Sequence, residues 1–107
     1  MNKEQTDKII ETIHKDIENE AYSKAKNELD EALQKDPDNI RLLLNRAKLY
    51  RQLQKFGDAF NDLQAIIKQN PDHQEAKSLL NLTRSILQGQ QLDIYASTNL
   101  NNDPWLD

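Results

Sequence analysis

Apolar residues recur along most of the chain at spacings of three and four, the pattern of amphipathic helices that pack on one another. The pattern predicts helices over about 3–19, 21–35, 40–53, 55–69 and 73–88. Pro37 and Pro71 end the second and fourth of these, because proline has no N–H to donate and disfavours helical geometry in the residue before it. Asp38 or Asn39 is the expected N-cap of the third helix, and Asp72 that of the fifth.

A longer period of 34 residues runs through the first four of these helices. A shift of this length superposes residues of the same kind, as in the pairs Tyr22 and Phe56, Ala25 and Ala59, Leu29 and Leu63, Leu33 and Ile67, and Pro37 and Pro71. The fifth helix keeps an apolar face but loses the repeat, since Lys77 and Asn81 stand where the shift would put counterparts of Leu43 and Ala47. It is therefore expected to cap the end of a repeat array.

The stretch from Leu43 to Pro71 resembles a tetratricopeptide repeat. Its first helix carries a large, a small and an aromatic residue in the family order, and its second helix follows with an aromatic, a small, a large residue and a proline: Leu43, Ala47, Tyr50, Phe56, Ala59, Leu63 and Pro71. The glycine usual before the second helix is replaced by Gln54. The resemblance implies an all-α, right-handed α-solenoid of two helix-turn-helix repeats plus a capping helix, together forming one domain over residues 3–88.

Composition narrows the possible functions. The chain has no cysteine, so disulfides, thiol catalysis and cysteine-based zinc sites are excluded. Its net charge is −4, which does not favour nucleic-acid binding, and no run is apolar enough to cross a membrane. His14 and His73 lie on different predicted helices, and no phosphate loop or nucleophile motif is present. We expect a soluble cytoplasmic protein that is not an enzyme and has no cofactor or metal.

The family resemblance implies a concave groove, lined by the first helix of each repeat, that binds extended peptides. The residues expected to form this groove are Arg41, Leu44, Asn45, Lys48, Arg51 and Leu82. Three of the six are cations on the third helix, whereas the first helix contributes acidic side chains, so the centre of the groove is expected to be basic and its first rim acidic. The expected ligand is an acidic or extended peptide of another protein.

Members of the family that serve as Hsp70 and Hsp90 co-chaperones grip a terminal carboxylate with five polar residues. Carried over to this chain, only Asn45 matches that clamp. Ile10 and His14 replace the expected residues of the first helix, and Glu75 and Leu79 those of the last. In the alternative register Arg41 and Asn45 would replace a lysine and an arginine. A chaperone-related partner stays open, without a full clamp.

Residues 89–107 have a different composition and are expected to form a flexible acidic tail, although 92–96 could extend the fifth helix. The tail holds the only tryptophan, within Asp103, Pro104, Trp105 and Leu106. This run looks like a short docking motif and is similar to the Asp-Pro-Trp motifs that endocytic proteins present to clathrin adaptors. The alternative is a solubilising end with one incidental aromatic. As a docking motif it would bind either the chain's own groove or a separate protein.

Two classes of function are consistent with these patterns. The first is a peptide-binding adaptor, similar to a co-chaperone module, that acts through its groove. The second is a small structural subunit whose faces are buried in a larger multiprotein assembly. A groove built from only two repeats is short, which favours the subunit more than a long solenoid would.

Overall fold

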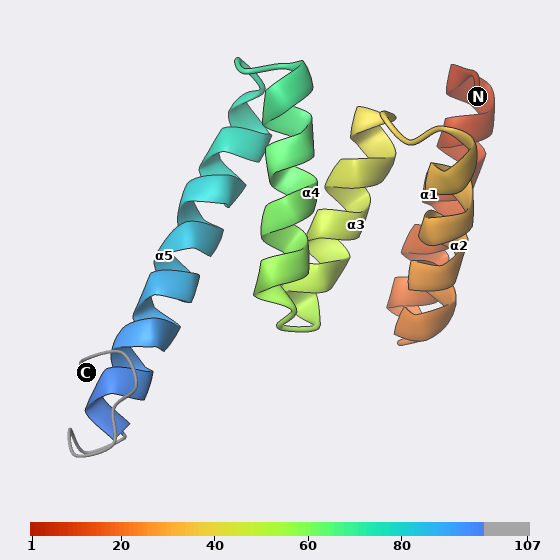
Figure 1. Ribbon diagram of the computed structural model, residues 1–107. Helices are drawn as coiled ribbons and strands as arrows, with labels where there is room; N and C mark the ends of the chain where they lie inside the picture. Colours follow the sequence, from red (N-terminus) through yellow and green to blue (C-terminus); the bar gives the residue numbers. More distant parts are fainter. Residues whose placement is uncertain (98–107) are drawn as a thin grey trace.

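The computed structural model describes the backbone of residues 1–97 and the side chains of residues 1–89, and within this part every regular element is an α-helix. The helices are α1 (Lys3–Glu18), α2 (Tyr22–Lys35), α3 (Ile40–Gln52), α4 (Phe56–Gln69) and α5 (Gln74–Ser97). The helices follow one another in chain order along the solenoid (Figure 1). Consecutive helices pack on each other, and α1 also contacts α3. The expected all-α solenoid of two helical hairpins followed by a capping helix is confirmed.

The ends of the first four helices lie within about one residue of the prediction, but the fifth was predicted too short. It was expected to end at residue 88, whereas α5 continues to Ser97, which agrees with the alternative that residues 92–96 extend this helix. Gly89 lowers helix propensity without breaking the hydrogen-bond ladder, and the next proline comes only at Pro104. Residues 98–107, including the expected docking motif, lie outside the described part of the chain.

Each repeat turns between its two helices through one residue with left-handed backbone geometry. These residues are Glu20, with φ of 59°, and Gln54, with φ of 61°, which are 34 positions apart. The N–H of Lys55 donates to the carbonyl oxygen of Tyr50 at 2.8 Å, and the N–H of Gln54 to that of Arg51 at 3.0 Å. This hydrogen-bond pair is the Schellman motif, whose left-handed residue is usually glycine. The structure thus explains the glycine expected from the family at this turn.

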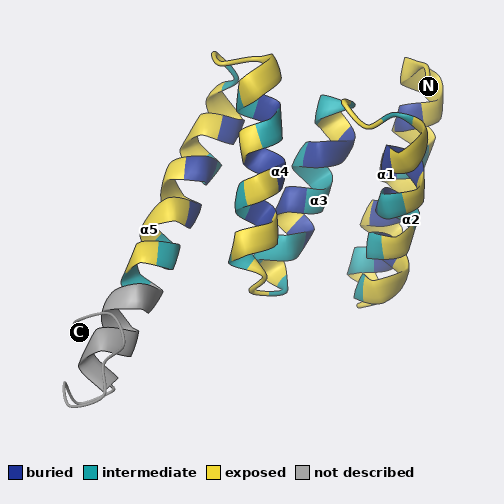
Figure 2. Cartoon of the chain, viewed as in Figure 1, coloured by how far each residue is buried: buried dark blue, intermediate teal, exposed yellow. Residues whose placement is uncertain are grey.

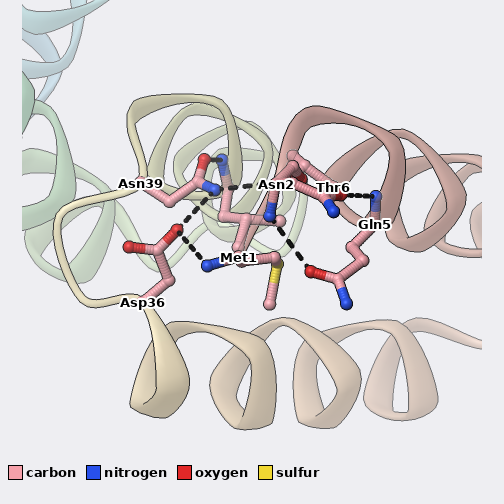
Figure 3. Close-up of polar contacts among 7 residues, drawn as sticks. Met1, Asn2, Gln5, Thr6, Asp36 and Asn39 are labelled. Carbon is pink, nitrogen blue, oxygen red and sulfur yellow. Dashed lines mark hydrogen bonds and ion pairs between the residues drawn. The ribbon is translucent and has the colours of Figure 1, made fainter.

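The start of α1 is tied to the loop between α2 and α3 by polar contacts (Figure 3). Asn39 caps α3 by accepting a hydrogen bond from the N–H of Leu42, which decides between the two caps, Asp38 and Asn39, that the sequence allowed. Its amide also donates to the Thr6 hydroxyl at 3.1 Å and to the Asp36 carboxylate at 3.0 Å. The expected cap of α5 was wrong by one residue, because Nδ1 of His73 rather than Asp72 accepts from the backbone at the helix start.

The core runs through the middle of the stack as one continuous cluster (Figure 2). The small residues Ala25, Ala47 and Ala59 are completely buried where helices cross, because their short side chains let the helices approach closely. Leu63 beside them is also completely buried. Within the described residues, no helix is both long and apolar enough to cross a membrane.

Candidate functional site

One side of the solenoid is formed by the first helices of the two repeats together with α5. Three polar contacts cross between these helices. The Arg41 guanidinium lies 2.6 Å from the Asp7 carboxylate, and the Lys48 ammonium lies 2.6 Å from that of Glu75. Between them the ring of His14 lies 3.2 Å from the amide oxygen of Asn45. We call this surface, which joins α1, α3 and α5, the groove face.

The groove face brings together most of the residues that the sequence predicted for it, but two of its cations are paired with acids, which the sequence did not predict. Arg41 is matched by an acid on α1 and Lys48 by one on α5. The cations therefore lie on the central helix α3, and acids face them from α1 on one side and from α5 on the other. All four side chains of these two ion pairs are about half exposed, at 48% to 51%, so water screens them strongly.

The remaining predicted groove residues have different environments. Leu44 is half-buried against the core, whereas Leu82 is 55% exposed and follows Lys48 by one repeat length. Arg51 is half-buried, and its Nε makes no hydrogen bond within the described residues. Asn45 also donates from its amide to the carbonyl oxygen of Arg41 at 2.8 Å. The face thus offers an apolar side chain and a guanidinium beside the two ion pairs.

The co-chaperone clamp does not assemble here. Ile10 is buried in the core and Leu79 is half-buried against it, so neither takes the place of a polar clamp residue. Asn45, the one residue that matches the clamp, is already hydrogen-bonded to its neighbours on α1 and α3. The structure brings Asn45 together with His14 rather than with further cations.

A charged network that the sequence did not predict lies on the opposite side of α3. Arg46 donates from Nε and Nη2 to the two oxygens of Asp62 at 2.8 and 2.7 Å, and from Nη1 to Asp30 at 3.0 Å. It also lies over the Tyr50 ring. These hydrogen bonds raise the pKa of Arg46 above its usual value despite its burial. The three charged residues are spaced 16 apart, which no helical period within one element would have revealed.

Asp30 of α2 also makes a charged contact within its own helix. It is only partly exposed and also accepts from Lys26 at 2.7 Å. Burial alone would raise its pKa, but the hydrogen bonds and charges of Lys26 and Arg46 outweigh burial, so its pKa is lowered. The network joins α2, α3 and α4 and is consistent with a structural role.

Two acidic side chains, Asp16 of α1 and Glu28 of α2, are neighbours where these helices meet. Asp16 is 7% exposed, its Oδ1 lies 3.6 Å from the Lys24 ammonium, and its Oδ2 has no hydrogen-bond partner within the described residues. Burial raises the pKa of the neighbouring Glu28, and Asp16 raises it further, because a protonated Glu28 can donate a hydrogen bond to the Asp16 carboxylate whereas an ionised Glu28 is repelled by it. No group of three or more metal-ligating side chains occurs in the described part of the chain.

Comparisons with known proteins agree with the fold. A family model described as tetratricopeptide repeat matches residues 16–83. Among curated proteins, the chain is 35% identical over 65 residues to sperm-associated antigen 1 of Rattus norvegicus, an alignment that covers 61% of this chain and 7% of that protein. It is 30% identical over 73 residues to protein PHOX1 of Arabidopsis thaliana, covering 68% and 10% respectively. The chain thus spans about a tenth or less of these relatives. No solved structure matches it.

Proposed function

Because the chain belongs to the tetratricopeptide repeat family, a family of non-enzymatic protein-interaction modules, we propose that its groove face binds an extended, acidic peptide segment of a partner protein. The proposed contact residues are Arg41, Leu44, Asn45, Lys48, Arg51 and Leu82. The observation that carries the proposal is the row of polar contacts across α1, α3 and α5, since it presents side chains from three helices along one line.

The two exposed ion pairs support exchange with a ligand. An exposed pair contributes only about 0–1 kcal/mol to stability, so a peptide carboxylate can replace Asp7 or Glu75 beside its cation at small cost. The peptide's backbone can then pair with the amide of Asn45. Such exchange is selective for acidic ligands, because a basic peptide would have to displace the cations of α3 instead.

Two further side chains favour a peptide over a small ion. Leu82 is an exposed apolar anchor one repeat length after Lys48. Arg51 takes part in no ion pair within the described residues, and because its Nε is buried, a contact to a ligand would come from its terminal guanidinium nitrogens. A segment that places one apolar side chain near Leu82 and carboxylates near Lys48 and Arg51 would satisfy all three residues.

The proposal also covers the tail motif, the location of the protein and its partner. The tail motif of Asp103, Pro104, Trp105 and Leu106 is proposed as a second docking element. A cytoplasmic location and a chaperone-related partner are compatible with the proposal. The groove chemistry, however, does not depend on a terminal carboxylate, because the five-residue clamp is absent.

Binding to an immobilised peptide array that varies acidity and apolar content tests the groove. The intact chain should prefer acidic peptides that carry one large apolar residue, and binding should weaken as salt is raised. The double variant Lys48→Glu/Arg51→Glu should lose this preference. Lys8→Glu, an exposed change on α1 outside the groove face, is the matched control and should bind as the native chain does. Equal binding by the double variant and the control would refute the groove.

A structural subunit of a larger assembly is the second candidate. It is favoured by the outer side of α1, where Met1 is 42% exposed and borders a hollow of about 460 Å³ with Ile9, Lys8 and Lys35. A preceding repeat would stack on this end of a longer solenoid. Size-exclusion of cell extract separates the two candidates. A species near 12.4 kDa favours the adaptor, and a fixed high-mass species favours the subunit.

A further inference from the structure

The contact between α4 and α5 is hollowed on the side that carries Phe60 and Arg84. One hollow, of about 450 Å³, is lined by Gln64, Ile67, Lys68, Leu80 and Arg84. The other, of about 630 Å³, lies between Leu87 of α5 and the first turns of α4, which contribute Lys55, Phe56 and Phe60. The Arg84 guanidinium lies 5.7 Å from the centre of the Phe60 ring and joins the two hollows. We call this surface the α4–α5 seam.

The same hollow occurs one repeat earlier, between α2 and α3. Five residues that line it each lie 34 positions before a residue that lines the first seam hollow: Asp30, Leu33, Gln34, Arg46 and Tyr50. There the charge is satisfied, because Arg46 is held by Asp30 of α2 and by Asp62 of the following helix, α4. An acidic side chain from the next segment of the chain thus completes the first hollow.

The seam has no such completion within the described residues. Leu80 stands in the place of Arg46, so the floor is more apolar. Lys55, Lys68 and Arg84 take part in no ion pair there, and Asp58 is the only acid that lines either hollow. In contrast, two cations of the groove face, Arg41 and Lys48, each form an ion pair. Among the described residues, the seam therefore combines aromatic and apolar walls with three cations and a single acid.

We propose that the chain's own C-terminal segment, residues 98–107, docks on the α4–α5 seam with Trp105 and Leu106 against its apolar walls. This segment comes next in the chain after α5, just as α4, which supplies the acid of the first hollow, comes next after α3. It carries Asp103 and Asp107 on either side of Trp105, which are complementary to Lys55, Lys68 and Arg84. A tryptophan flanked in this way is a typical anchor for a partly apolar pocket.

The length of the chain allows this docking within one molecule. Leu87 lies ten residues before the end of α5, or about 15 Å along the helix. Trp105 follows Ser97 by eight residues, which span up to about 26–29 Å when extended, so the tail can turn back to Leu87. A tether this short gives an effective concentration on the order of millimolar, so even a weak site would be well occupied.

Fluorescence of the full chain tests the proposal, because Trp105 is its only tryptophan. At low protein concentration the native emission should lie to the blue and resist quenching by acrylamide. Arg84→Glu and Lys55→Glu should each shift the emission to the red and increase quenching, because they reverse a cation of the seam. Raising salt should move the native protein in the same direction. Helical circular dichroism checks that the variants, both changed at exposed residues, remain folded.

Two controls separate this docking from other sites. Lys8→Glu should leave the emission unchanged, since it lies at the other end of the solenoid. Lys48→Glu should also leave it unchanged, although it weakens peptide binding to the groove face, so failure of the groove and failure of the seam are told apart. Emission that responds to Lys48→Glu but not to Arg84→Glu would place the tail in the groove and overturn the proposal. So would a red native emission, or a blue one that appears only as concentration rises, which would indicate a second copy.

Discussion

Glu28 and Asp62 occupy equivalent positions in the two repeats, 34 residues apart, but their neighbours differ. Asp62 is paired with Arg46, whereas the residue equivalent to Arg46 in the first repeat is the exposed Thr12. Glu28 faces the buried carboxylate of Asp16 instead. The same position therefore carries a favourable charge in one repeat and an unfavourable one in the other.

Replacing Glu28 by glutamine should stabilise the protein at neutral pH. Burial, followed by the hydrogen bond and charge of Asp16, raises the folded-state pKa of Glu28 above its unfolded value of about 4.3. The stability that Glu28 contributes is thus present below about pH 4.3 and lost as pH rises through the folded pKa. We expect Glu28→Gln to raise the free energy of unfolding by up to about 1 kcal/mol at pH 7, given partial exposure. Urea unfolding at pH 7 and pH 3 measures this. If Glu28→Gln raised the free energy of unfolding by the same amount at pH 3, the charge of Glu28 would not be the cause.

At the scale of elements, the turn between the helices of each repeat fixes how they pair. Gln54 adopts the left-handed conformation in which the Schellman hydrogen bonds form. A side chain with a Cβ tolerates this conformation at a cost of about 1–2 kcal/mol. The cost is borne because the buried contacts of Ala59 and Leu63 depend on this turn to bring α3 and α4 together.

Glycine at position 54 should remove that strain. Part of the gain is offset by the greater freedom of glycine in the unfolded chain, about 0.4–1 kcal/mol. We therefore expect Gln54→Gly to stabilise the protein by up to about 1 kcal/mol, as measured by thermal or urea unfolding. Gln54→Ala keeps the Cβ and serves as the control, with stability close to that of the native protein. If alanine stabilised as much as glycine, backbone strain would not be the cause.

At the scale of the whole molecule, Arg46 links the two repeats. It is the one described side chain that hydrogen-bonds to both α2 and α4, while its backbone belongs to α3. Asp62 is buried to 6% exposure, so removal of Arg46 would leave its charge unpaired inside the protein. The network therefore couples the stability of one repeat to that of the other.

Truncation of Arg46 should destabilise the protein far more than truncation of another arginine on the same helix. Arg46→Ala is expected to lower the free energy of unfolding by about 1.5–3 kcal/mol, the range for hydrogen bonds to charged groups. Arg41→Ala, which breaks the half-exposed pair with Asp7, should cost at most about 1 kcal/mol. Urea titrations followed by circular dichroism measure both. Similar losses would show that the burial of Asp62 does not set the stability.

The number, order and core face of the helices followed from the sequence, because helical periodicity and the turn residues are local signals. The buried Ala47, Ala59 and Leu63 could be identified in this way, as could the N-cap Asn39. The family, too, was recognisable from the 34-residue period. The end of α5 was placed too early, with the extension over 92–96 left only as an alternative, because a single glycine is a weak stop signal and no proline follows until residue 104.

The sequence by itself thus determined an all-α solenoid and the residues that alternate between its core and its surface. Only the tertiary structure decided which charges meet. The 34-residue period makes Asp7 and Arg41 equivalent positions of the two repeats, but it does not show that their side chains touch, and it does not relate Lys48 to Glu75 at all. The groove face was placed by periodicity, but its electrostatic character was set by packing of α1 and α5 beside α3. Electrostatic interactions depend on distance and solvent exposure, and both are properties of the folded chain rather than of its pattern.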